Sequence, residues 1–173
     1  MNNTPNKLSA VIISAIVMIV LSTVPVISLI NVLCCMGIIL GGFAGVSYYS
    51  RQVTPGSGLL TAKDSVMIGL LSGIIAGIVN TGISLVISLF SKTNPIAEML
   101  ELFSNSGSKM PPEAMEILEK LSQEFTKYGY SPTLTIITLV MNLVLFPLFG
   151  ILGSYIAFHI FKKKNFQQPP IQQ

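Results

Sequence analysis

Charged side chains are scarce in this sequence. Only 10% of its 173 residues are Asp, Glu, Lys or Arg, whereas 51% are hydrophobic. A soluble globular domain typically has about 25% charged residues. This chain therefore has too few charged side chains to cover the surface of a soluble fold, and its composition favours an integral membrane protein.

The residues that build catalytic and metal sites are also few. Histidine occurs once, as His159, and the two cysteines, Cys34 and Cys35, are adjacent. Two cysteines are too few for a disulfide framework, and one histidine leaves a metal site without enough ligands. The sequence has no GxSxG or HExxH motif, and its glycine-rich turn lacks the ending of a P-loop. We therefore expect no catalytic, cofactor-binding or metal-binding residues, and no enzyme activity.

What the sequence does contain is four long apolar blocks. We expect them to form transmembrane helices at about 8–30, 32–50, 62–90 and 132–161. Each block meets or approaches the ~20 residues that cross a ~30 Å hydrocarbon layer as a helix, and none alternates like a barrel strand. The sequence predicts an all-α integral membrane protein that forms one domain over 1–173, with a disordered tail over 165–173.

The first block has a competing interpretation as a cleaved signal peptide, with Lys7 as its charged region. The apolar cores of signal peptides usually run about 7–15 residues, whereas this one reaches about 17 before Pro25. A retained transmembrane helix is therefore the preferred interpretation.

Ionisable residues are absent from the interior of all four predicted spans. Pumps, voltage sensors and coupled carriers usually need such groups inside the membrane, so their absence argues against those classes. The most polar residues at membrane depth are Asn80 and Asn142. We expect these amides to hydrogen-bond a neighbouring helix; alternatively, together with Thr81 they line a permeation path.

The polar islands between the spans differ in charge. If the N-terminus is cytoplasmic, the cytoplasmic islands hold six Lys or Arg and one Asp, a balance of +5. The opposite side then holds four Lys and six Glu, a balance of −2. The positive-inside rule therefore predicts a multi-pass membrane protein with both termini in the cytoplasm.

Glycines recur at four-residue intervals in the second and third spans, at Gly37, Gly41 and Gly45 and at Gly69, Gly73 and Gly77. Small residues with this spacing let two helix backbones approach closely in a bilayer. The glycines lie at matching depths in the two antiparallel spans, so we expect these spans to pack against each other glycine to glycine. Alternatively, each row packs against a second copy or a partner subunit.

The segment 91–131 between the third and fourth spans is predicted to be extracytoplasmic, amphipathic and helical. Asn94 and Pro95 are typical of a helix start, and Gly129 is typical of a helix end. The candidate partner surface of this segment consists of Phe103, Leu121 and Phe125.

Several features resemble a family of uncharacterised four-span bacterial membrane proteins, a domain-of-unknown-function group with a hydrophilic excursion between spans three and four. They are the basic turn Arg51–Lys63, Gly69-Leu70-Leu71-Ser72-Gly73, Met110-Pro111-Pro112-Glu113-Ala114-Met115 and the terminal Phe161-Lys162-Lys163-Lys164. The resemblance covers about 32–164 and rests mainly on layout. It implies a fold and a membrane location, without an activity or functional residues.

The sequence leaves three functions open. The first is a non-enzymatic scaffold or accessory subunit that acts by helix–helix association. The second is a small oligomeric channel or permease, and the third is a lipid- or partner-sensing protein. The expected partners are the lipid bilayer and either further copies of the chain or other membrane subunits. No cofactor and no nucleic acid is expected.

Overall fold

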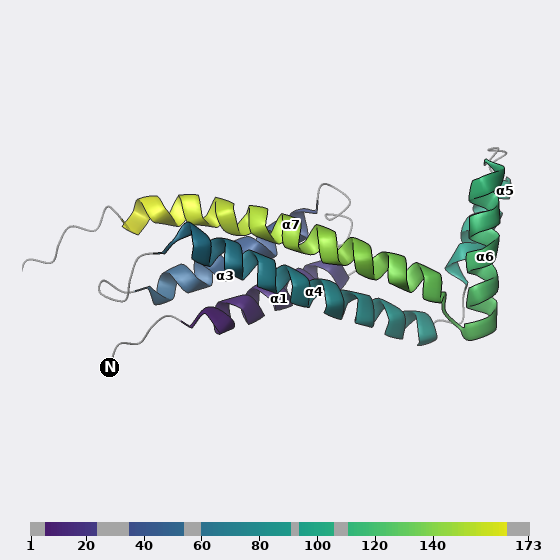
Figure 1. Cartoon of the computed structure of the whole chain (residues 1–173), viewed down its shortest axis with the longest axis horizontal. Helices are drawn as coiled ribbons and strands as arrows, with labels where there is room; N and C mark the ends of the chain where they lie inside the picture. Colours follow the sequence, from purple (N-terminus) through teal and green to yellow (C-terminus); the bar gives the residue numbers. More distant parts are fainter. Residues whose placement is uncertain (1–5, 24–34, 54–59, 91–93, 106–110, 166–173) are drawn as a thin grey trace, which may run out of the picture. The chain divides into compact units, whose positions relative to one another are not determined.

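A computed structural model describes residues 6–23, 35–53, 60–90, 94–105 and 111–165. All regular structure in these ranges is helical, which confirms the all-α fold (Figure 1). The helices are α1 (Lys7–Thr23), α3 (Met36–Gln52), α4 (Ala62–Phe90), α5 (Pro95–Asn105), α6 (Pro112–Tyr128) and α7 (Pro132–Asn165). The expected turn after Pro25, the glycine-rich loop, Cys34 and all of the expected tail but Asn165 lie outside the described residues.

Two helices are long and apolar enough to cross a membrane. They are Ala62–Phe90, with 29 residues, and Pro132–Lys162, with 31. Helices α1 and α3 have 17 residues each, which gives a length of about 25 Å against a hydrocarbon layer of ~30 Å. Of the four expected spans, the described helices thus provide two that are clearly long enough.

The helix ends follow the local signals in the sequence. The Thr61 hydroxyl accepts the Asp64 amide proton (3.1 Å) and donates to the Asp64 carboxylate (2.6 Å), which is a reciprocal cap at the start of α4. The Asn94 side chain accepts from two backbone amides in the first turn of α5. Gly129 ends α6 with a φ of 78°, in the left-handed region that suits glycine. The predicted starts of α4 and α5 and the end of α6 are therefore confirmed.

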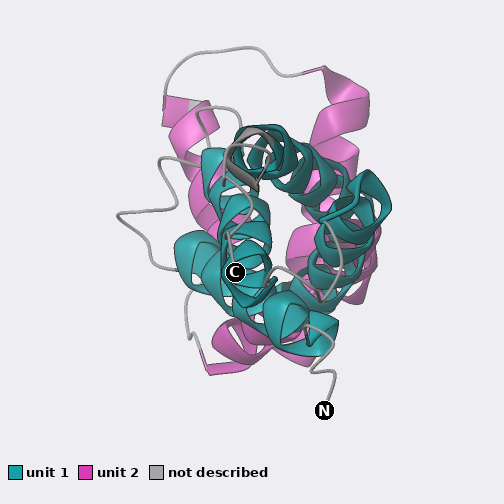
Figure 2. Ribbon diagram, turned by 90° about the vertical axis from the view of Figure 1, so that its left-hand side faces the viewer, with its two compact units in different colours: residues 1–80, 142–173 teal, residues 81–141 magenta. Residues whose placement is uncertain are grey.

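Contacts divide the chain into two compact units, coloured separately in Figure 2. Unit 1 comprises residues 1–80 and 142–173, and unit 2 comprises residues 81–141. Unit 2 is therefore longer than the expected excursion 91–131, because it includes the last ten residues of α4 and the first ten of α7.

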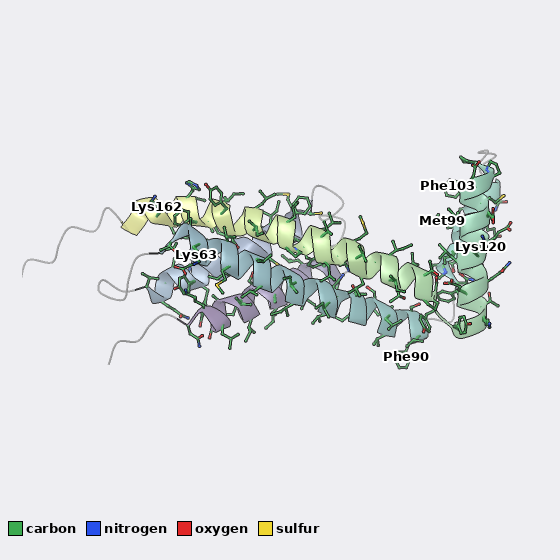
Figure 3. The ribbon with its side chains drawn as sticks, viewed as in Figure 1. Lys63, Phe90, Met99, Phe103, Lys120 and Lys162 are labelled. Carbon is green, nitrogen blue, oxygen red and sulfur yellow. The ribbon has the colours of Figure 1, made fainter. Side chains whose placement is uncertain are left out.

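In unit 1, the start of α1 lies beside the end of α3 and the start of α4. The Asn6 amide at the start of α1 donates to the Gln52 side chain at the end of α3 (3.1 Å). The Lys7 ammonium lies 2.6 Å from the Asp64 carboxylate at the start of α4. Lys63 and Lys162 are found at this same end in Figure 3. The helices of unit 1 thus run alternately up and down, and their basic residues gather at one end.

The interior of unit 1 has two apolar clusters. The larger consists of Ala10, Val11, Val46, Tyr49, Leu60, Ile68, Ala157 and Phe158. The smaller consists of Ala15, Met18, Ile38, Ala76 and Phe146. Each cluster draws residues from the described helices α1, α3, α4 and α7, so these four helices share one core.

The side chains of unit 1 are distributed in an unusual way. Ser14, Ser65, Ser72 and Ser154 are completely buried. The outer faces of the same helices carry large exposed apolar side chains, among them Leu8, Ile12, Ile16, Leu40, Leu71, Ile78, Leu152, Ile156 and Ile160. Soluble proteins rarely expose apolar patches larger than a few hundred Å². Unit 1 thus has small polar side chains inside and branched apolar ones outside.

In unit 2, α5 packs on α6. The Asn94 amide group donates to the Ser122 carbonyl (3.3 Å) and hydroxyl (3.1 Å), which ties the start of α5 to the middle of α6. Ile96, Leu121 and Phe125 are buried. The opposite face of α6 is polar, with a Lys120–Glu116 ion pair (2.8 Å) one turn apart. The predicted amphipathic character of this segment is therefore present in the structure.

Candidate functional site

Unit 2 contains a pocket of about 380 Å³. It is lined by Thr81, Ser84, Leu85, Ile87 and Ser88 of α4, by Pro95 and Phe125, and by Ser131, Leu134, Thr135 and Thr138 at the start of α7. The volume lies within the ~300–1,000 Å³ that is typical of small-molecule sites. All the lining residues belong to unit 2, so this pocket is the candidate functional site.

The spacing of the lining residues explains why they face one space. Thr81, Ser84 and Ser88 lie three and four residues apart on α4, and Ser131, Thr135 and Thr138 are spaced by four and three at the start of α7. Residues with this spacing share one face of a helix. Each wall of the pocket is therefore a row of hydroxyl side chains on an otherwise apolar helix.

The pocket has a buried floor and an exposed rim. Thr81, Phe125 and Ser131 are buried and form the floor. By contrast, Ser84, Ile87, Pro95 and Leu134 are exposed, so they lie at the rim. Three of these four rim residues are apolar, so a molecule entering the pocket meets mainly hydrocarbon.

The Glu124 carboxylate stabilises the turn at the start of α7, next to the floor of the pocket. Glu124 of α6 accepts from the Ser131 hydroxyl (2.6 Å), from the Thr133 hydroxyl (2.6 Å) and from the Thr133 amide (3.1 Å). The Ser131 hydroxyl also accepts the Leu134 amide proton (3.1 Å), and so caps the start of α7. The hydrogen bonds from Ser131 and then Thr133 favour the ionised carboxylate and lower the pKa of Glu124 below its usual value.

This lowered pKa predicts the pH dependence of the turn. A carboxyl with a lower pKa in the folded chain contributes stability above its unfolded pKa, about 4.3, and that stability is lost as the pH falls through the folded pKa. We expect the amides of Thr133 and Leu134 to lose protection against hydrogen exchange, relative to intrinsic rates, as the pH falls below the usual pKa of a glutamate side chain. Glu124→Gln should remove this pH dependence, and Glu119→Gln on the same helix should leave it. Equal pH dependence in both variants would contradict the role of Glu124.

The predicted glycine rows lie at helix contacts, but not at the expected ones. A side chain at Gly41 would meet Met18 of α1, and one at Gly45 would lie 2.5 Å from Ser14 Cβ. The row of α3 therefore packs on α1. Gly37, the first glycine of this row, is also buried.

The glycine row of α4 packs on α7. A Cβ at Gly69 would lie 2.6 Å from the Gly150 carbonyl oxygen, and one at Gly73 would lie 2.5 Å from Pro147 Cα. A Cβ at Gly77 would lie 3.0 Å from the Asn142 carbonyl oxygen. The expected glycine-to-glycine pairing of α3 with α4 is thus wrong. Matching depth does not identify a partner, because every antiparallel helix of a bundle has residues at the same depth.

The other predicted residues occupy mixed environments. Asn80 and Asn142 are half-buried, and each has an interaction partner. Of the candidate partner surface, Leu121 and Phe125 are each only 8% exposed and pack within unit 2, whereas Phe103 is 40% exposed. Only Phe103 of these three therefore presents an open surface.

A serine network in unit 1 was not anticipated from the sequence. The Ser14 hydroxyl lies 2.9 Å from both the Gly41 carbonyl oxygen and the Ser72 hydroxyl, which links three helices. The Ser154 hydroxyl donates to the Gly42 carbonyl (3.2 Å) and links α7 to α3. The available signal was Ser72, which directly precedes Gly73 of the glycine row in α4. The hydroxyl rows of the pocket were missed as well, apart from Thr81.

Comparisons of the chain with protein-family models, with curated proteins and with solved structures found no match. The resemblance to a four-span family stays a prediction, and the function is argued from the geometry of the two units.

Proposed function

We propose that this chain is a non-enzymatic, multi-pass membrane protein that serves as a scaffold or accessory subunit. In this proposal unit 1 is embedded in the bilayer, and the α5–α6 pair binds a partner outside it. The observation that carries the proposal is the side-chain distribution of unit 1, with buried serines and exposed Ile and Leu. Lipid tails are as apolar as Leu, so small and polar residues are the ones that hold membrane helices together.

The proposal includes four membrane spans. At 17 residues each, α1 and α3 lie at the short end of the ~17–25 residues that span a bilayer. Short spans are accommodated by local thinning of the bilayer at modest cost. The gathering of Lys7, Lys63 and Lys162 at one end of unit 1 supports an arrangement in which both termini and the 53–61 connection lie on the cytoplasmic side.

Association is favoured over transport by the way the interior of unit 1 is filled. Met18, Val46 and Ile68 are buried to 1% exposure or less, and the glycine rows of α3 and α4 are already covered by α1 and α7. No space for a solute is left where these side chains pack. A partner would instead meet the face of α5 that exposes Met99, Leu102 and Phe103. Met99 and Phe103 are labelled in Figure 3.

The partner proposal is tested by site-specific crosslinking in native membranes. A photoreactive residue in place of Leu102, which is 70% exposed, is expected to give a discrete adduct with a second copy or another membrane protein. The matched control is a photoreactive residue at Glu119 on the polar face of α6. A diffuse background from both positions would contradict association through α5.

The proposed topology predicts a labelling pattern. In a chain whose Cys34 and Cys35 are replaced by Ala, Glu119→Cys should react with a membrane-impermeant maleimide in intact cells. Lys63→Cys should react only after permeabilisation, because it belongs to the basic end of unit 1. The reverse pattern would place the termini on the outer side.

A further inference from the structure

We propose that the pocket of unit 2 binds one acyl chain of a membrane lipid. This inference rests on the membrane location proposed above and adds a ligand to it. Its starting point is the pocket of about 380 Å³ between the hydroxyl rows of α4 and α7, closed at its floor by Phe125.

The chemistry of the walls favours an apolar occupant. The Ser131 hydroxyl donates to Glu124 and accepts from the Leu134 amide, and the Thr135 hydroxyl donates to the Ser131 carbonyl one turn back (2.9 Å). Thr81 and Ser84 have partners as well. Hydroxyls that are already paired within the protein present mainly their methyl and methylene groups to the pocket. Together with Leu85, Phe125 and Leu134, they form a wall that is mostly hydrocarbon.

The length of α4 favours a lipid as the occupant. The part of α4 in unit 1, residues 62–80, is 19 residues long, or about 28 Å, which nearly matches the ~30 Å hydrocarbon layer. The ten residues 81–90 exceed the span, yet four of them are large, apolar and exposed: Val86, Ile87, Leu89 and Phe90, the last to 84%. The first ten residues of α7 are similar, with Ile136 and Ile137 exposed. Apolar surface at the edge of the bilayer is best covered by the chains of neighbouring lipids.

The pocket has the right size for a single chain. An engineered cavity of about 150 Å³ holds benzene, which has six carbons, and on that scale this pocket holds roughly 15 carbons. One fatty acyl chain therefore fills it. Entry is sideways over the exposed rim residues Ile87 and Leu134, which join the apolar outer faces of α4 and α7.

The test uses a phospholipid with a photoreactive diazirine near the end of its acyl chain. The full chain is reconstituted in phosphatidylcholine vesicles that contain this lipid, irradiated and mapped by mass spectrometry. We expect the adducts to concentrate on 81–88 and 131–138. Thr138→Phe, which fills the pocket from one wall, should lower them about tenfold. Ser88→Leu fills it from the other wall and should have the same effect. Ile137→Phe, an exposed neighbour that does not line the pocket, should leave the yield unchanged.

Each other outcome overturns the inference. Adducts that spread over all exposed apolar residues and do not respond to Thr138→Phe would indicate ordinary lipid contact. A free fatty acid probe that labels the pocket when the phospholipid does not would rule out a membrane lipid, and chain-to-chain adducts at 81–88 would identify a second copy as the occupant. Flotation of the vesicles separates the two proposals. A chain that floats without pocket adducts refutes the pocket alone, and a chain that does not float refutes the membrane location and the pocket with it.

Discussion

Gly153→Ala is expected to destabilise unit 1 by about 3 kcal/mol, at the upper end of the usual cost of overpacking. Gly153 of α7 faces α3, and a methyl group there would overlap the Ile39 carbonyl group and lie 2.9 Å from Ile39 Cα. All three of the nearest atoms belong to the Ile39 backbone. A backbone cannot move aside as a flexible side chain can, so the two helices must separate.

The neighbouring glycines predict a graded series. A Cβ at Gly42 would overlap the Gly150 carbonyl of α7, so Gly42→Ala should be about as costly as Gly153→Ala. Gly41→Ala should cost less, because the first atom it meets is in the side chain of Met18. The unfolding midpoint in SDS titrations of the reconstituted protein measures this order.

Gly82→Ala is the matched control. It replaces a helical glycine of α4 by the same residue, but no atom lies within 4 Å of the added methyl group. Alanine is favoured over glycine in a helix interior by about 1 kcal/mol, so this variant should be as stable as the parent or more so. If Gly153→Ala and Gly82→Ala unfold at the same point, the close contact of α3 with α7 is refuted.

Much of the local structure could be predicted from the sequence because it depends on neighbours in the chain. A cap needs only a hydroxyl or amide next to the first turn, as at Thr61, Asn94 and Ser131. The start of α4, the ends of the amphipathic helices and the long apolar run of α7 were all found in this way. Helix α7 also continues through Pro147, in agreement with the single span expected over 132–161.

Helix pairing could not be predicted in the same way. The spacing of Gly69, Gly73 and Gly77 shows that another helix comes close, but any helix with a small or concave surface can do so. The structure places Gly150 and Pro147 of α7 there, and neither was part of a long glycine row. Choosing among the partners needs three-dimensional information that four-residue spacing does not contain.

The pocket was missed for a related reason. Its hydroxyls come from two rows about 50 residues apart in the chain, and each row alone is typical of ordinary polar positions in a membrane helix. Only Phe125, expected on a partner surface, and Thr81, expected on a permeation path, were singled out from the lining. The structure places both in the lining of the pocket instead, and both are buried.

Exchanging two adjacent residues of α4 should destabilise the bundle without altering the composition of the helix. Ser72 is fully buried, whereas Leu71 is 39% exposed. In Leu71→Ser/Ser72→Leu the hydropathy of α4 is unchanged, so insertion into the membrane should be normal. The bundle, however, would receive a leucine where the Ser72 hydroxyl now lies 2.9 Å from the Ser14 hydroxyl. We expect a loss of about 3 kcal/mol from overpacking, and about 1 kcal/mol more from the lost hydrogen bond between helices.

Two single variants divide that loss into its parts. Ser72→Ala keeps the small volume and removes only the hydroxyl, so it should cost about 1 kcal/mol. Leu71→Ser changes only the outer face, and should leave the SDS unfolding midpoint near that of the parent. The exchange variant and both single variants should resist carbonate extraction as the parent does, since these changes alter packing more than the hydrophobicity of the helix. If the exchange variant and the parent have the same SDS unfolding midpoint, Ser72 does not face Ser14, and the arrangement of α1 beside α4 is incorrect. If it unfolds early while remaining in the membrane, the buried serines hold the bundle together.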